Sequence, residues 1–167
     1  FLQSMERNGC VGATYGWLPR HLAIYDGSAL VAAMPLYEKH NSYGEFVFDH
    51  AWASAYQRAG LAYYPKLVSA VPYTPATGQR LLCAVQRQQE LFPLLLDAAL
   101  QLTRRIGASG FHCLFPADSE QRYMEQRQLL SRHDCQFHWY NQGYACFDDF
   151  LQRLTAKKRK NIRQERR

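Results

Sequence analysis

Two carboxylates in the segment 43–49, Glu45 and Asp49, are candidates for proton transfer in this sequence. Their neighbours Phe46 and Phe48 would keep water from a carboxylate, which raises its pKa toward neutrality and suits it to act as a general base. If residues 45–49 are extended, the two carboxylates share one face about 13 Å apart, too far to act as a pair. A helix cap at Asp49 and an ion pair at Glu45 are the structural alternatives.

Hydroxyl and basic residues, with one glycine, in and after a predicted strand at 63–71 could bind an anion. These candidates are Tyr64, Lys66, Thr77, Gly78 and Arg80. A loop after a parallel strand is where α/β sheets bind ligands, and its free backbone N–H groups suit phosphate or carboxylate. With a single glycine, residues 72–80 match neither a Walker loop nor a dinucleotide motif, and an ordinary turn explains them about as well.

Two histidines, His112 and His138, each lie between apolar neighbours in a short predicted strand. Because strand neighbours point to opposite faces, both imidazoles could line one cleft and transfer protons, and a structural role is the alternative. Trp139 and Asn141, close to His138, join the substrate-binding candidates. Cys135 and His138 suggest a zinc ligand pair, but residues three apart in a strand face opposite sides, so we predict no metal site.

The positive charge of the chain is concentrated at one end. The net charge is +6, yet residues 1–150 carry −1 and residues 151–167 carry +7. On a helix Arg159, Arg163 and Arg166 form one stripe, with Lys160 beside it, that could clamp the phosphates of a polyanion. A solvated helix end is the alternative interpretation.

The period of the apolar residues predicts the elements that position these side chains. Residues 91–106 repeat at steps of three and four, as in an amphipathic helix, and residues 21–25 and 30–37 form a hairpin around Asp26-Gly27. The other predicted strands are 46–48, 63–71, 111–115 and 136–140, and the other predicted helices are 1–7, 51–59, 118–132 and a segment from 147 onward. Strands joined through helices pair in parallel, so we expect an α/β domain with a mixed sheet flanked by helices and a protruding C-terminal helix.

Composition places the chain among ordinary folded proteins. Its 167 residues are 47% hydrophobic and 20% charged, which excludes a disordered or repeat-only chain and favours one domain. No apolar stretch approaches the roughly 20 residues of a membrane span. Five cysteines without a recurring spacing predict a reducing, cytoplasmic setting rather than a disulfide framework. The last helix has little to bury after Leu154 and no cap, so we expect the natural chain to continue beyond Arg167.

Seven short segments, spread over most of the chain, resemble one known family. They are YGEFVFD (43–49), YYPK (63–66), AVPYTP (70–75), GQR (78–80), QFHW with Asn141 (136–139), FDDF (147–150) and RKNIR (159–163). Together they look like the FemAB-like N-acyltransferases of bacteria, a branch of the GNAT acyltransferase superfamily. Members have two GNAT-like halves and roughly twice this length, which implies an N-terminal half at 1–150 and a basic linker helix at 151–167 leading to a second half.

The resemblance implies transfer of an acyl or aminoacyl group to the amine of a small molecule or peptide. Relatives attach amino acids from aminoacyl-tRNA to peptidoglycan precursors. By position, Glu45 or Asp49 would transfer the proton, Lys66 and Arg80 would bind an anion, and His138 and Asn141 would orient the substrate.

The acyl donor stays open, with acyl-CoA and aminoacyl-tRNA as the candidates and no tightly bound cofactor expected. The loop lacks the second glycine near Gly78 that the GNAT coenzyme-A pattern has, which favours aminoacyl-tRNA, or no donor at all. Three functions follow: half of an amide-forming transferase, an RNA- or tRNA-binding module that uses the basic helix, and a non-catalytic binding domain for a cell-wall precursor.

Overall fold

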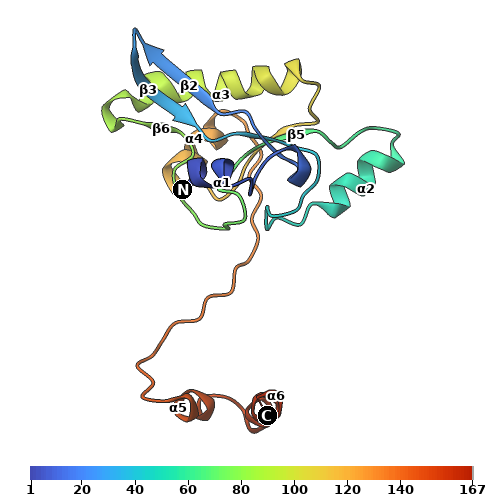
Figure 1. The fold of residues 1–167 in the computed structure, drawn as a ribbon, viewed down its shortest axis with the longest axis vertical. Helices are drawn as coiled ribbons and strands as arrows, with labels where there is room; N and C mark the ends of the chain where they lie inside the picture. The colour runs from blue at the N-terminus through green and yellow to red at the C-terminus, as the bar shows by residue number, and fades with distance from the viewer. Residues whose placement is uncertain (167) are drawn as a thin grey trace. The chain divides into compact units, whose positions relative to one another are not determined.

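Two β-sheets organise the first part of the chain in the computed structural model, which describes residues 1–166 (Figure 1). The chain divides into unit 1, Phe1–Ser131, and unit 2, Arg132–Arg167. All described strands belong to unit 1, and the α/β class expected from the sequence is confirmed. The arrangement is consistent with a GNAT-like sheet flanked by helices, while the division at residue 150 and the missing second half stay predictions.

The larger sheet has four strands in the order β1-β4-β5-β7. These strands are β1 (Trp17–Pro19), β4 (Tyr37–Lys39), β5 (Lys66–Ser69) and β7 (Phe111–Cys113). Strands β1, β4 and β5 pair antiparallel, whereas β5 and β7 pair parallel, with α3 in the connection between them. The mixed sheet therefore includes the parallel pair that the strand-helix-strand pattern predicted.

The smaller sheet is antiparallel and contains the predicted hairpin. It consists of β2 (Leu22–Asp26), β3 (Ala29–Met34) and β6 (Leu82–Cys83). Gly27 has φ +59 in the turn, a conformation that glycine adopts without the steric cost of a Cβ. The hairpin and the helix α2 (His50–Arg58) lie at opposite ends of unit 1 (Figure 1).

The main hydrophobic core lies between the sheets and helix α3 (Gln88–Arg105). Leu91, Leu95 and Ala99 of α3 pack there against Leu67 of β5 and Met34 of β3. The helix begins three residues before the predicted start, which puts Pro93 at its sixth position rather than in the first turn. The apolar stripe still identifies the buried face correctly, because the spacing of three and four matches the helical repeat.

The opposite face of the larger sheet has a different character. Trp17, Tyr37 and Val68 form a second apolar cluster there, and the same face carries charged side chains that are described below. Two further helices, α1 (Leu2–Arg7) and α4 (Asp118–Gln126), complete unit 1, together with the 3-10 turns Ala13–Tyr15 and Val85–Arg87. The predicted helix at 118–132 ends at Gln126, and Gln128 adopts φ +63 just after it.

Unit 2 contains the helices α5 (Phe147–Gln152) and α6 (Ala156–Glu165), and the predicted strand at 136–140 is wrong. The alternation of apolar residues there is real, but no described residue of unit 2 lies in a strand that could pair with it. The strand predicted at 46–48 is wrong too, because Gly44 and Phe46 adopt positive φ and turn the chain. Within residues 1–166, none of the helices is long and apolar enough to cross a membrane.

Candidate functional site

Two lysines stand opposite each other on the face of the larger sheet away from α3. Lys39 ends β4 and pairs in register with Lys66, the first residue of β5, so both side chains point to the same side. Both are fully buried. A buried ammonium group requires compensating partners, and the loop that follows β4 supplies them.

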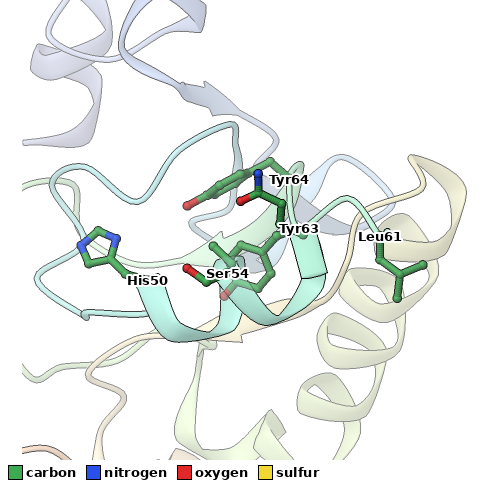
Figure 2. Close-up of a pocket in the computed structure, with 7 residues that line it drawn as sticks. His50, Ser54, Leu61, Tyr63 and Tyr64 are labelled. Atoms are coloured by element: carbon green, nitrogen blue, oxygen red, sulfur yellow. The ribbon is translucent and has the colours of Figure 1, made fainter. Parts of the chain in front are cut away.

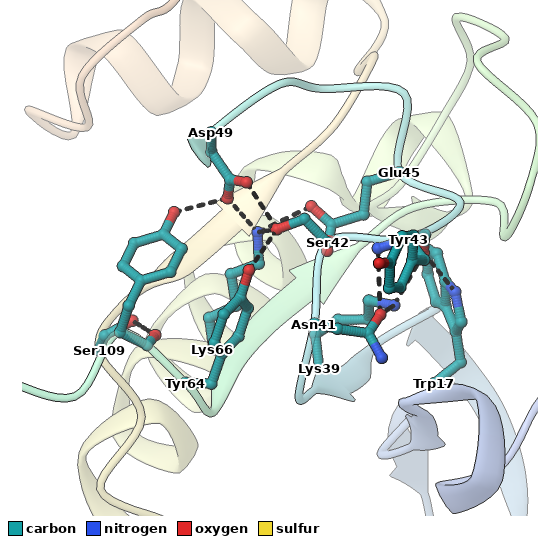
Figure 3. A network of polar contacts seen from close by, with 11 residues as sticks. Trp17, Lys39, Asn41, Ser42, Tyr43, Glu45, Asp49, Tyr64, Lys66 and Ser109 are labelled. Atoms are coloured by element: carbon teal, nitrogen blue, oxygen red, sulfur yellow. Dashed lines mark hydrogen bonds and ion pairs between the residues drawn. The ribbon is translucent and has the colours of Figure 1, made fainter. Parts of the chain in front are cut away.

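Both candidate carboxylates converge on Lys66 (Figure 3). The Lys66 Nζ atom donates to Glu45 Oε2 at 2.8 Å and also to Asp49 Oδ2. The expected separation of about 13 Å is therefore wrong, since the turn at Gly44 and Phe46 replaces the extended backbone that it assumed. Gly44 also has φ +77, and a Cβ there would lie 2.4 Å from the ring of Tyr73, so the turn needs a glycine.

Three hydroxyl groups complete the network around Lys66. Tyr63 donates to Asp49 Oδ2 at 2.6 Å, and Ser42 donates to Asp49 Oδ1 at 2.6 Å. The Tyr64 hydroxyl lies 2.7 Å from Ser42 Oγ and acts as the donor, because the Ser42 proton points at Asp49. Lys66 contributes a further bond to Ser42 Oγ at 3.3 Å. Asp49 occupies the N-cap position of α2, but its side chain makes no capping hydrogen bond there. It belongs instead to this buried network.

The two carboxylates have opposite electrostatic properties. Burial alone would raise the pKa of Asp49, but the hydrogen bonds from Lys66, Ser42 and Tyr63 outweigh it and lower that pKa to about 2. For Glu45, burial dominates over the attraction of Lys66 and raises the pKa above its usual value. The second oxygen of Glu45, Oε1, is buried without a hydrogen-bond partner among the described residues. Asp49 is therefore a fixed anion, whereas Glu45 takes up a proton more readily than an ordinary carboxylate.

Lys39 forms a second cationic centre beside this network. Its Nζ atom lies 3.8 Å from the centre of the Trp17 ring and donates to the carbonyl oxygen of Tyr43 at 3.1 Å. Burial lowers the pKa of Lys39 to about 8, against the attraction of Glu45. Lys39 and Glu45 are thus two buried groups in which burial favours the uncharged form.

An open pocket of about 320 Å³ adjoins the network (Figure 2). Helix α2 supplies His50, Ser54 and Gln57 to its wall, and Tyr63 and Tyr64 supply the other side. The hydroxyl groups of these two tyrosines bond to Asp49 and Ser42. The tyrosines therefore connect a space open to solvent with the buried charges, and a small polar ligand in the pocket would lie against both rings.

The loop at 77–81 binds an anion, but that anion is part of the protein. The backbone N–H groups of Arg80 and Leu81 donate to the carboxylate of Glu120 at 2.8–3.0 Å. The Arg80 guanidinium is buried and donates to the carbonyl oxygens of Leu114, Gln79 and Ala76. The free N–H groups expected here are therefore occupied, and Arg80 stabilises the loop. Thr77 is exposed, and Gly78 pairs with Pro116 in an isolated bridge.

A family model described as peptidoglycan biosynthesis or recognition matches residues 1–167, the whole chain. The chain belongs to the FemAB-like family. No curated protein and no solved structure matches the chain. The family links this protein to the bacterial cell-wall polymer peptidoglycan and confirms the resemblance carried by the seven sequence segments.

The structure of this FemAB-like chain brings only part of the predicted site together. Glu45, Asp49, Tyr64 and Lys66 meet in one network, but Lys66 binds internal carboxylates and is not available to an external anion. His112 lies on the same sheet face, with its ring 6.4 Å from the ring of Tyr63.

The other predicted residues belong to unit 2. His138 is exposed and lies 2.8 Å from Gln136, while Trp139 and Asn141 line a groove within that unit. Arg159, Lys160 and Arg163 lie on α6, as the helical pattern predicted. Their roles in binding or catalysis stay predictions.

Four residues of the FemAB-like site were missed at the level of sequence. Ser42 and Tyr63 are single hydroxyl residues without a motif, and Glu120 lies about 40 positions from the backbone groups that it binds. Only Lys39 could have been found from the sequence. It lies two residues after Tyr37 in a strand, and this spacing predicts that both side chains point to the same face of the sheet. A buried lysine in that position implies a nearby carboxylate.

Proposed function

We propose that this FemAB-like protein is an N-acyltransferase that attaches an acyl or aminoacyl group to an amine of a peptidoglycan precursor. The single observation that carries the proposal is Glu45, a buried carboxylate with a raised pKa and an unpartnered oxygen. Amide formation requires a group that accepts the proton of the amine, and a carboxylate whose pKa is raised by burial is suited to this role. The family description supports the peptidoglycan part of the proposal.

The acceptor amine would lie in the pocket formed by α2 and the two tyrosines. From there, a series of hydrogen bonds leads inward to Glu45. The Tyr64 hydroxyl donates to Ser42, and Lys66 donates both to Ser42 and to Glu45. Asp49 holds Lys66 and Tyr63 in place as a permanent anion. In this assignment Glu45 is the final proton acceptor, and Asp49 is a positioning residue.

The reaction balances without a metal or a redox step. The amine nitrogen attacks the carbonyl carbon of the donor, so that a C–N bond forms. The bond from that carbon to the leaving oxygen or sulfur then breaks and its electron pair goes to the leaving group. The amine gives one proton to Tyr64 as Tyr64 passes its own proton to Ser42. The Ser42 proton turns from Asp49 to Lys66 as Lys66 passes one of its protons to Glu45. Lys66 thus remains an ammonium, Glu45 is protonated, and the amide product is neutral at nitrogen.

For the donor, the loop at 77–81 favours aminoacyl-tRNA over acyl-CoA. Phosphate groups of a nucleotide donor are commonly bound by backbone N–H groups of such loops. Here Glu120 occupies the N–H groups of Arg80 and Leu81, and its carboxylate would repel a phosphate placed beside it. A donor that is held elsewhere by its nucleic acid avoids this conflict.

The test is product formation with each donor. The protein is incubated with an amine-bearing muropeptide precursor and either acetyl-CoA or aminoacyl-tRNA, and the amide is detected by mass spectrometry. We expect product with aminoacyl-tRNA, and we expect Glu45→Gln to slow it about 100- to 10,000-fold, which is the usual contribution of a general base. The rate of the parent protein should fall as pH decreases through the raised pKa of Glu45.

A matched control is Glu90→Gln, which neutralises an exposed carboxylate paired with Arg87 and should leave the rate unchanged. Thermal melting of both variants shows whether each is folded. Absence of product with both donors, or a folded Glu45→Gln variant as fast as the parent, contradicts the proposal. In the first case a binding domain for the precursor becomes the better reading.

A further inference from the structure

Unit 2 contains an aromatic groove that the proposed reaction does not use. The groove encloses about 520 Å³ and is lined by Trp139, Asn141, Tyr144, Cys146, Phe147 and Phe150. The Trp139 and Tyr144 rings stack at 6.2 Å between centroids, and Phe150 meets both of them edge-on. Trp139 nevertheless keeps 65% of its surface exposed. This large flat ring is held in place by its neighbours and still open to a ligand.

Helix α6 supplies a concentrated positive charge next to this groove. Five basic residues lie within α6, and among residues 1–166 none of its three lysines, Lys157, Lys158 and Lys160, forms an ion pair. Its only large apolar residue is Ile162. A helix without an apolar face gains little by packing on protein or by inserting into a bilayer, so its charges remain available in solvent.

Two contacts join the helix to the groove. The guanidinium of Arg166, just after α6, lies 4.0 Å from the centre of the Phe147 ring, which lines the groove. Arg163 pairs with Asp148 at 3.2 Å. Arg159 lies one turn before Arg163 and continues the same basic stripe along α6. Aromatic rings of the groove and cations at the end of α6 are thus in contact within unit 2.

We propose that this surface binds single-stranded nucleic acid, with a base stacked on Trp139 and the phosphates bound along α6. Proteins that bind single strands combine such a basic track with aromatic rings, because every base has a face that can stack. The charge of the surface complements a phosphate backbone, and the groove accepts a flat ring. An anionic membrane fits less well, since α6 has no apolar face to bury.

The binding test measures fluorescence anisotropy of labelled 12-nucleotide oligomers with the full chain. The arms are single-stranded RNA, single-stranded DNA, a duplex of the same sequence, and vesicles of anionic phospholipid. We expect one or both single strands to bind more tightly than the duplex, and the better of the two identifies the sugar. Affinity should decrease with salt, with a slope in log K against log salt of about −0.7 for each phosphate bound.

Variants separate stacking from charge. Trp139→Ala should weaken binding of the single strand about 5- to 150-fold, and Trp139→Phe, which keeps a ring, should restore most of it. Replacing Lys157, Lys158, Arg159 and Lys160 by Gln should make the salt slope shallower by about 3. Trp52→Ala, at another exposed tryptophan that lies in unit 1, is the matched control and should leave the affinity unchanged.

The outcomes are distinct from those of the transfer assay. No binding of either single strand, equal binding of the duplex, or binding of the vesicles alone overturns the proposal. So does a folded Trp139→Ala variant with unchanged affinity. Because the oligomers carry no acyl group, binding can be present when transfer fails, and transfer can be present when binding is absent.

Discussion

Two buried carboxylate sites in unit 1 use the same type of group for different purposes. At Lys66, two carboxylates share one ammonium, one of them keeps an unpartnered oxygen, and an open pocket adjoins the network. At the loop 77–81, the Glu120 carboxylate accepts from two backbone N–H groups, and the Arg80 guanidinium is bound by carbonyl oxygens. The first site has unused bonding capacity and shifted pKa values, and the second holds the chain together.

The comparison shows what distinguishes the proposed reactive site from a structural one when both are buried and polar. Burial is nearly complete in each: Glu45 is 3% exposed and Glu120 is 1% exposed. The difference lies in hydrogen bonding: both oxygens of Glu120 accept from backbone N–H groups, whereas Oε1 of Glu45 has no partner among the described residues. Five tests of this distinction follow, from the largest expected effect to the smallest.

The largest effect on stability is expected from removing the ammonium group of Lys66. Lys66→Met leaves Glu45 and Asp49 buried without their shared partner, so we expect the free energy of unfolding to decrease by about 3–5 kcal/mol. Urea denaturation followed by circular dichroism measures it. Adding Glu45→Gln and Asp49→Asn should recover part of the loss, while Lys157→Met, at an exposed lysine, should cost little. A loss below about 1 kcal/mol for Lys66→Met would contradict the network as described.

Substitutions at Glu120, in the loop site, should lower the stability of the protein without removing transfer activity. Glu120→Ala removes the acceptor of two buried N–H groups, and we expect a cost of about 2–4 kcal/mol in the same denaturation experiment. Glu120→Gln keeps one carbonyl oxygen and should cost less. If the folded Glu120→Gln variant also abolished transfer with aminoacyl-tRNA, the division into a reactive and a structural site would be wrong.

Protonation of Asp49 in acid should lower the free energy of unfolding. Its pKa is lowered to about 2 in the folded state against 3.8 when unfolded, so the unfolded chain binds more protons in that window. Asp49 therefore contributes stability above pH 3.8, and about 2 kcal/mol is lost as pH falls toward 2. Asp49→Asn should remove this part of the acid dependence.

Glu45 and Lys39 should change the pH dependence of stability in opposite directions, because the pKa of Glu45 is raised and that of Lys39 is lowered. Glu45, with a raised pKa, lowers stability as pH rises above its unfolded value of 4.5. Lys39, lowered from 10.5 to about 8, makes stability rise between those two values. Glu45→Gln and Lys39→Met should each flatten the curve in its own window, and an unchanged curve for both would contradict the shifts described here.

The smallest effect is expected at the boundary between pocket and network. Tyr64→Phe removes the hydroxyl that bonds to Ser42 and should cost about 1 kcal/mol, less than Tyr63→Phe, whose hydroxyl bonds to the charged Asp49. Differential scanning calorimetry of the two variants measures the order. The reverse order would indicate that Asp49 depends on Ser42 and Lys66 more than on Tyr63.

Much of the fold could be predicted from periodicity and turn chemistry. The stripe from Leu91 to Ile106 gave α3, and Asp26-Gly27 between two apolar runs gave the hairpin, because local spacing decides both. The strands expected at 46–48 and 136–140 failed for different reasons. Positive φ at Gly44 and Phe46 turned the first, and the second has alternation without a partner strand in unit 2.

The sequence predicted which residues form part of the candidate site but not how they contact one another. Glu45, Asp49 and Lys66 were identified from their types, but their mutual contact depends on a loop whose backbone no local pattern specifies. Glu120 and Ser42 were missed, since a single carboxylate or hydroxyl acquires a role only through the residues that the fold brings to it. Tertiary contacts thus decided which predicted anion-binding groups remained available.

The alignment of Lys39 with Lys66 across β4 and β5 also bears on assembly of the sheet. A shift of β5 by one residue would carry the Lys66 ammonium beneath α3, among Leu67, Leu91 and Leu95 in the native core, and bring Leu67 to the charged loop. Mispaired sheets would thus bury a charge in hydrocarbon. The two lysines of the proposed site thus also favour the native register of the strands that carry them.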